Sequence, residues 1–322
     1  HSLAQFMQSV IVNKEYLTGT TYRDVHAKGV AALKAELIVE SDVPAELRHG
    51  VFSEPRRYPA WVRVSNSSQS PSPDHDKDIR GFGLKLMDVP GEKLLAPQSH
   101  ADTQDFLFLT TDVFLTSNTR EFYDFIVAFN TSFLASLWFA IRHPEIAWKL
   151  LLARQRYGNL LDQQYFSATP FRLGELAVKH SLRPVCSRRS SIPDDPANNY
   201  LRDRIAAQLS REEVYFDFLV QVQRDPYRQP IEDALVSWSQ KISPFRKVAT
   251  LRIPRQRVDT PERNQIGENL AMNVWHALPD HRPLGNVNRA RRIVYFEIAR
   301  FRHERNLAPL EEPTAGPEFL DS

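Results

Sequence analysis

The chain has 322 residues, of which 42% are hydrophobic, so it is long enough to bury a sizeable core. Its 41 basic and 39 acidic side chains leave a formal net charge of +2, which gives no strong attraction for nucleic acid. A single cysteine, Cys186, excludes an intramolecular disulfide and a zinc or iron–sulfur site built on several thiolates. We expect Cys186 to be an inert, packed thiol in a protein of a reducing compartment.

Hydrophobic periodicity predicts the following elements in chain order. The first is a helix before residue 16, followed by an extended arm and by strands at residues 61–65, 82–87 and 106–109. Helices are predicted between residues 119 and 157, strands at residues 214–223 and 247–253, and a helix containing residues 288–302. Strands that do not alternate regularly with helices indicate the α+β class, with an antiparallel sheet or barrel. Without a linker or an internal repeat, we expect one domain over residues 1–322, ending in a proline-rich tail at about 306–322.

Residues 133–141 form the longest apolar run and are interrupted only by Ser136. The run is too short to span a bilayer, which needs about 20 apolar residues. It continues into an apolar helical region that is broken or kinked at Pro144. We expect it to pack in the core; the alternatives are a channel for an apolar substrate, a homodimer face or a surface that contacts lipid.

The predicted C-terminal helix places Tyr295 between two arginines. At about 100° per residue, Tyr295 lies about 40° from Arg291 and Arg302 about 20° from it, so the three side chains share one stripe. A positive charge beside a phenol favours the phenolate form, and phenolate is an anionic oxygen donor suited to ferric heme iron. By itself such a pattern is more often a solvated helix face.

Three further segments give this stripe a context: residues 22–29 around His26, residues 61–66 (Trp-Val-Arg-Val-Ser-Asn) and residues 78–86 around Arg80-Gly-Phe. Together with the Tyr295 helix they resemble, in order, motifs of the heme catalases. Residues 165–174 and 275–285 resemble the small catalase-related heme peroxidases. The resemblance runs from about residue 20 to about residue 305. It implies a closed antiparallel β-barrel with flanking and C-terminal helices and heme b between barrel and helices.

The resemblance implies roles on both faces of the heme. Tyr295 would be the axial iron ligand, and Arg291 would hold it as phenolate. His26 would act as general acid and base on a peroxide, with Ser65 fixing its orientation. Val25 would pack on the porphyrin. Phe122 or Tyr123 would stack near the ring, unless both belong to the helix core.

The heme carboxylates would be bound by three arginines that align with those of the family, because a guanidinium grips a carboxylate bidentately. They are Arg23, Arg63 and Arg302.

One departure from the family concerns the distal asparagine that helps to position peroxide. The match falls on Leu109 or Thr110, and neither is an amide. Thr110 could donate one hydrogen bond but lacks the reach of an amide. Since misplacement by about 1 Å can cost about a hundredfold in rate, we expect weak disproportionation of hydrogen peroxide.

The sequence therefore predicts a heme peroxidase that reduces organic hydroperoxides, such as those of fatty acids, with a small-molecule electron donor. One alternative is a hydroperoxide isomerase resembling the catalase-related allene oxide synthases, although those carry threonine where this chain has Val25 before His26. Another is a heme-binding protein without turnover. We expect a cytoplasmic protein, and export stays open because the sequence does not begin with methionine.

Other catalytic patterns are weaker. Asp74-His75-Asp76 resembles a metal site but lies in a Ser/Pro/Asp-rich stretch, where a solvated loop is expected. His276 and His281 have no acidic or cysteine partner at a spacing typical of zinc. Neither a phosphate-binding glycine loop nor a Gly-x-Ser-x-Gly motif occurs.

Overall fold

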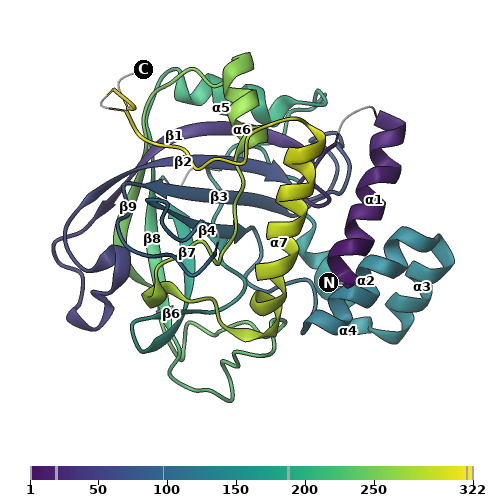
Figure 1. The fold of residues 1–322 in the computed structure, drawn as a ribbon, viewed down its shortest axis with the longest axis horizontal. Helices are drawn as coiled ribbons and strands as arrows, with labels where there is room; N and C mark the ends of the chain where they lie inside the picture. Colours follow the sequence, from purple (N-terminus) through teal and green to yellow (C-terminus); the bar gives the residue numbers. More distant parts are fainter. Residues whose placement is uncertain (1, 19–20, 97, 187–188, 317, 321–322) are drawn as a thin grey trace.

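A closed antiparallel sheet lies at the centre of the computed structural model, which describes residues 2–18, 21–96, 98–186, 189–316 and 318–320 (Figure 1). Around the barrel the strand order is β5-β4-β3-β2-β1-β9-β8-β7, and pairing of β5 with β7 closes the ring. β6 extends β7 outside the ring. The bounds are β1 Gly29–Val39, β2 Arg57–Asn66, β3 Arg80–Met87, β4 Thr103–Leu109, β5 Tyr165–Phe166, β6 Phe171–Leu173, β7 Leu176–Pro184, β8 Val214–Val222 and β9 Arg246–Ile253. The predicted α+β class and closed antiparallel barrel are confirmed.

The interior of the barrel is filled by aromatic and aliphatic side chains. Phe106 and Phe218 pack with ring centroids 5.2 Å apart, and Phe82 packs against Tyr165 at 5.0 Å. All four side chains are buried. A barrel of this size has room for side chains but not for a large cofactor as well, so a large ligand must bind outside it.

The five predicted strands are all present, and three more in the ring were missed. The longest of them, β1, has no two-residue alternation, because most of its residues on both faces are buried. It is covered on the outside by α6 (Pro261–Asn269) and α5 (Tyr200–Leu209). Two-sided burial removes the alternation on which sequence-based strand assignment depends.

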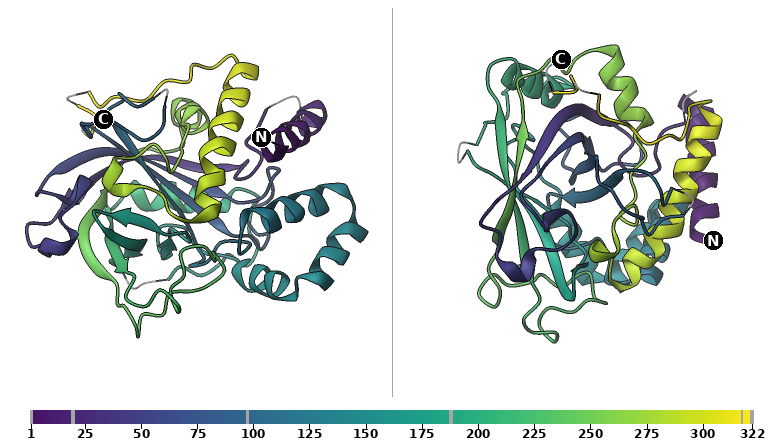
Figure 2. Two further views of the ribbon diagram at one scale, coloured as in Figure 1. Left: turned by 60° about the horizontal axis from the view of Figure 1, so that its bottom comes forward. Right: turned by 60° about the vertical axis from the view of Figure 1, so that its left-hand side comes forward.

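The remaining helices are α1 Ser2–Thr18, α2 Thr119–Thr131, α3 Phe133–Arg142, α4 Pro144–Ala153 and α7 Gly285–Arg305, with short 3-10 turns at Ala45–Leu47, Gly50–Phe52 and Pro279–His281. α1 packs beside α7, and α2 to α4 project from the barrel next to them (Figure 2). Ser132 separates α2 from α3 and caps α3 by accepting a hydrogen bond from the Ala135 backbone at 3.1 Å. Pro144 begins α4, where its missing N–H costs nothing.

The core-packing expectation for residues 133–141 is wrong. Phe133 is 80% exposed and Trp138 61%, whereas Phe139 is buried. Helices α3 and α4 each meet their neighbours through one face only. Most of their large apolar side chains lie on the opposite, solvent-exposed face. No helix of the described residues is both long and apolar enough to cross a membrane.

Three smaller expectations also need correction or completion. Cys186 is exposed, because it follows the end of β7 instead of lying within it. Asp74 is not solvated; it is buried and accepts a hydrogen bond from Lys28 Nζ at 2.7 Å, which compensates its charge. The tail packs on the barrel, with Glu312 bound to Lys85 and Phe319 against Trp61; its residues 317, 321 and 322 lie outside the described part.

Candidate functional site

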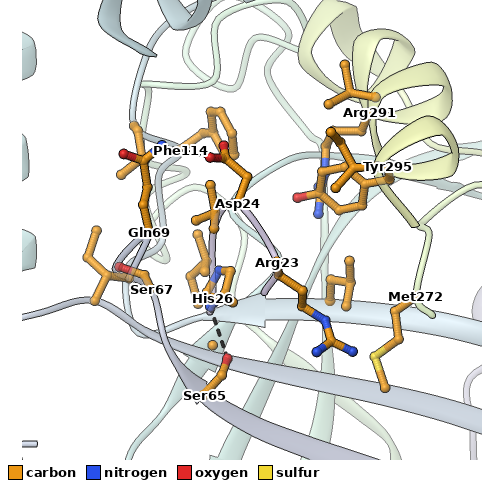
Figure 3. A pocket seen from close by; sticks show the side chains of 18 of the residues that line it. Arg23, Asp24, His26, Ser65, Ser67, Gln69, Phe114, Met272, Arg291 and Tyr295 are labelled. Carbon is orange, nitrogen blue, oxygen red and sulfur yellow. Dashed lines mark hydrogen bonds between the residues drawn. The ribbon is translucent and has the colours of Figure 1, made fainter. Parts of the chain in front are cut away.

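A largely apolar cavity of about 410 Å³ lies between one side of the barrel and the helices α1, α2 and α7 (Figure 3). The barrel contributes two rows of cross-strand neighbours, one made of Ser65, Gly81 and Leu109 and one of Arg63, Gly83 and Leu107. Opposite the barrel the wall includes Tyr295 and Phe122. Since all strand residues in these rows point outward, the cavity is separate from the packed barrel interior.

His26 enters this cavity from a strained stretch of backbone. Its φ angle is 62°, in the left-handed region that L residues rarely adopt and that costs of order 1 kcal/mol. Hydrogen bonds hold the stretch in place: the His26 N–H donates to Ser67 O at 3.3 Å, and Arg63 donates to His26 O at 3.1 Å. Strain that is maintained in this way is typical of functional positions.

The imidazole of His26 is oriented by the barrel wall. Its Nδ1 lies 3.0 Å from Ser65 Oγ, and the other ring nitrogen points away from Ser65 (Figure 3). A methyl group at Gly81 would come within 2.5 Å of the ring and 2.8 Å of Ser65 Oγ. Only glycine at position 81 therefore leaves room for this pair.

Burial and the positive charge of Arg63 lower the pKa of His26 to about 4, against a smaller opposing effect of Asp78. The side chain is therefore neutral near pH 7 and has one nitrogen free to accept a proton. Asp78 itself accepts hydrogen bonds from Ser67 and Ser68 at the edge of the cavity.

A second polar group of the cavity consists of three arginines around one glutamate. Arg23 lies in the extended arm before β1, Arg63 on β2 and Arg302 on α7. All three donate hydrogen bonds to the C-terminal end of α6. Arg23 forms an ion pair of 2.9 Å with Glu268, and Arg63 lies 3.4 Å from it. Arg302 donates to the Glu268 carbonyl at 2.5 Å, and Arg63 donates to the Gly267 carbonyl at 3.0 Å.

This cluster carries three positive charges and one negative charge, so its net charge is three minus one, or +2. Burial and repulsion from Arg23 lower the pKa of Arg63 to about 9, and burial also lowers the pKa of Arg302. Burial alone would raise the pKa of Glu268, but the attraction of the arginines outweighs it and lowers the pKa. A buried excess of positive charge is costly unless anions compensate it, so the site is suited to an anionic ligand.

Tyr295 lies on the other side of the cavity, on α7, where it points toward the segment that carries His26 (Figure 3). The Arg291 guanidinium stacks on the Tyr295 ring, with 4.9 Å between its central carbon and the ring centroid. Its Nη1 donates to Asn288 at 3.1 Å and to Thr169 at 3.3 Å. Arg291 Nε is buried and has no hydrogen-bond partner among the described residues.

The chain is similar to known proteins in its fold. No protein-family model and no curated protein matches the sequence. Solved structures do match: a bacterial catalase with a TM-score of 0.72 and 21% identity, a fungal catalase with 0.73 and 16%, and catalase A from Saccharomyces cerevisiae with 0.72 and 16%. Each match covers 91% of this chain.

The chain has the catalase fold. It spans 60–64% of the length of these three catalases. Barrel, arm and C-terminal helix thus form the arrangement that the sequence motifs implied, with a cavity between the barrel and the helices.

In this catalase fold the assignment of Thr110 to the site needs correction. Leu109 lies in the outward row and lines the cavity, whereas Thr110, which follows the end of β4, is not among the residues that line it. Thr110 Oγ accepts the backbone N–H of Arg80 at 3.0 Å. The side chain that faces the cavity at the end of β4 is therefore apolar.

The other predicted residues of the catalase-fold site are brought together. Val25 and Phe122 both line the cavity, whereas Tyr123 packs edge-on against Phe6. Phe122 also contacts Phe114, with ring centroids 5.4 Å apart. Of the two aromatic candidates on α2, Phe122 is therefore the one that a ligand would meet.

Sequence reasoning missed several residues of this site. Glu268 lies on a short polar helix without a motif. Asn288 lies one turn before Arg291 on α7 and accepts a hydrogen bond from it, a local contact that the motif-based reading did not assign. Asp24 is buried beside His26 and accepts a hydrogen bond from Gln69 at 3.1 Å. The Asp-Val-His order around His26 was the one signal that could have identified Asp24.

Proposed function

We propose that the protein is a heme b peroxidase that reduces organic hydroperoxides, in particular those of fatty acids, at the expense of a small-molecule electron donor. The observation that carries the proposal is the cavity with His26 and Ser65 on the barrel side and Tyr295 on α7, with a buried arginine cluster beside it. The catalase fold supports the proposal by analogy.

The residues present fit heme b. The +2 excess of the arginine cluster matches the two carboxylates of the porphyrin, which Arg23, Arg63 and Arg302 would bind. Tyr295 offers an anionic oxygen for the iron. The buried and unpartnered Nε of Arg291 is a donor next to the Tyr295 ring and could stabilise that oxygen as phenolate. When bound, heme would supply the redox centre at which the peroxide is reduced.

The chain's own residues would move the proton. If Nδ1 of His26 donates to Ser65 Oγ, the second nitrogen is an acceptor at neutral pH, because the pKa is lowered to about 4. It would take the proton from the terminal oxygen of the hydroperoxide and return it to the oxygen bonded to carbon, which leaves as an alcohol while the O–O bond breaks. Overall, the hydroperoxide, two electrons from the donor and two protons would give the alcohol and water.

The cavity wall favours a bulky apolar hydroperoxide over hydrogen peroxide. Leu109 is one of the two positions at which the family resemblance expects the polar group that would position the small substrate, and Phe114, Phe122 and Phe125 add apolar side chains to the cavity wall. Apolar walls bind an alkyl chain through burial, at about 25 cal/mol per Å². We therefore expect only weak disproportionation of hydrogen peroxide.

The first test is the optical spectrum of the full chain after addition of heme. The proposal expects a high-spin ferric spectrum of the phenolate type, and Tyr295→Phe should weaken heme retention or change the spin state. An unchanged spectrum and affinity in this variant would place the iron ligand elsewhere. Phe296→Leu, on the same helix, is the matched control.

The second test is turnover of a fatty-acid hydroperoxide with and without a reducing dye. Alcohol formation that requires the dye supports the peroxidase. Conversion without a donor, to an epoxide or its hydrolysis products, would instead identify an isomerase. Heme binding without any turnover would leave a heme-binding protein.

A further inference from the structure

The helices α3 and α4 expose large apolar side chains to solvent. Together with the end of α2 we call them the apolar helical surface, which consists of Phe129, Phe133, Leu134, Leu137, Trp138, Ile141, Trp148, Leu151 and Leu152. On α3 these residues recur at helical spacing, so they share one face, while Phe139 on the opposite face is buried. Monomeric proteins rarely leave so many large apolar side chains exposed without a partner.

Positive charge accompanies this surface. Between residues 129 and 156 the basic side chains are Arg142, Lys149, Arg154 and Arg156, and the only acidic one is Glu145, a net charge of four minus one, or +3. Lys149 is paired with Glu145 at 2.7 Å, whereas the three arginines are exposed. Apolar side chains next to exposed basic ones complement an anionic lipid surface.

The aromatic residues agree with this partner. Trp138 is 61% exposed and Trp148 60%, whereas Trp61, Trp238 and Trp275 are buried. Exposed tryptophan is unfavourable in water but is enriched where a protein meets the headgroup region of a membrane. Both exposed tryptophans of this chain lie on the apolar helical surface.

The surface also adjoins the cavity. Phe129 and Leu150 line the cavity and lie on α2 and α4, and the exposed Arg154 lines it as well. The three helices project from the barrel instead of forming a flat face (Figure 2). A two-fold dimer through this surface would bring together two patches that each carry a net charge of +3, which is repulsive, whereas an anionic bilayer attracts them.

We propose that the apolar helical surface docks the protein on an anionic lipid bilayer. Docking would bring the side of the cavity that is lined by Phe129, Leu150 and Arg154 next to the bilayer, so that an apolar ligand could reach the cavity without crossing water. The attachment is peripheral, by insertion of side chains from α3 and α4. Lipid binding does not depend on heme or turnover, so it can hold or fail independently of the proposed peroxidase activity.

Sedimentation of the full chain with vesicles tests the proposal. Vesicles of equimolar phosphatidylglycerol and phosphatidylcholine should bind the protein, and phosphatidylcholine vesicles should bind it more weakly. The double variant Leu137→Ser/Trp138→Ser should bind at least about tenfold more weakly, while Tyr227→Ser, which changes an exposed aromatic side chain outside this surface, should bind normally. Both L137S and W138S lie at exposed positions, so circular dichroism should show an unchanged fold.

A second readout uses the native chain. Vesicles with brominated acyl chains should quench the fluorescence of Trp138 and Trp148, and high salt should reduce binding by screening the arginines. Absence of both quenching and sedimentation would overturn the proposal. It would also be overturned if the double variant bound lipid normally, or if the native chain were a dimer that the double variant dissociates without a change in lipid binding.

Discussion

Ser65 Oγ lies 3.0 Å from His26 Nδ1, and the residue opposite Ser65 on the neighbouring strand is Gly81. The barrel wall thus supplies both the hydrogen-bond partner of the imidazole and the space in which it stands. This relationship makes the orientation of His26 a property of the strand pairing between β2 and β3. Substitution of Ser65 on β2 or of Gly81 on β3 tests this relationship.

Ser65→Ala removes the hydroxyl and should lower the rate at which the heme-loaded protein reacts with a hydroperoxide. A neutral hydrogen bond contributes about 1 kcal/mol, so the expected loss is about fivefold. Rapid-mixing spectroscopy measures the rate. Because Ser65 acts through His26, Ser65→Thr should restore part of the rate, and the exposed Ser70→Ala should leave it unchanged. A full rate in Ser65→Ala would show that His26 needs no such support.

Gly81→Ala should have the larger effect, because the added methyl would lie within 2.6 Å of His26 Nδ1 and 2.8 Å of Ser65 Oγ. Relief of the clash must displace the imidazole, and a shift of about 1 Å can cost about a hundredfold in rate. The same measurement on Gly316→Ala, where the methyl would meet nothing within 4 Å, provides the control. A near-normal rate in Gly81→Ala would mean that the position of His26 does not limit the reaction.

The rate should also depend on pH in a way set by His26. Its pKa of about 4 leaves the neutral base available at neutral pH, and the rate should fall as the pH decreases through about 4. His26→Asn should lose both the fast rate and this pH dependence; asparagine tolerates the positive φ angle of 62° better than most residues. A pH profile that survives the substitution would assign the proton transfer to another group.

The same shift affects stability. The unfolded chain has the ordinary histidine pKa of 6.5, so between pH 6.5 and about 4 it binds more protons at His26 than the folded chain does. Protonation therefore favours unfolding as the pH falls through this interval, and the free energy of unfolding should decrease. Thermal melts between pH 6.5 and pH 4 measure this effect. The melting temperature should fall less with decreasing pH in His26→Asn than in the native chain.

Glu268→Gln removes the only carboxylate that the described structure places among the three arginines. Without heme, the variant should be less stable by about 1–3 kcal/mol, a value reduced for the partial exposure of Glu268. Heme carboxylates would replace the lost charge, so heme should raise the melting temperature more in this variant than in the native chain. Glu297→Gln, at a half-buried position of α7, is the control. An equal increase in both chains would argue against carboxylate binding by the arginines.

Much of the fold could be predicted from the sequence. The alternation in β8 and the spacing of Arg291, Tyr295 and Arg302 on α7 are local patterns, and both are present in the structure. The family-like segments also predicted the barrel and the convergence of His26, Ser65 and Tyr295 on one cavity. Strand β1 could not be found in this way because burial on both faces removes its alternation.

Local patterns do not report which side of a residue faces a neighbour from a distant part of the chain. The sequence by itself determined the chemistry: an imidazole, a phenol and an excess of arginines at fixed spacings. Only the tertiary structure decided that Leu109 and not Thr110 faces the cavity, that Glu268 lies among the arginines, and that the longest apolar run is exposed. The reason is that burial and charge pairing depend on contacts between residues far apart in the chain, which the sequence order does not contain.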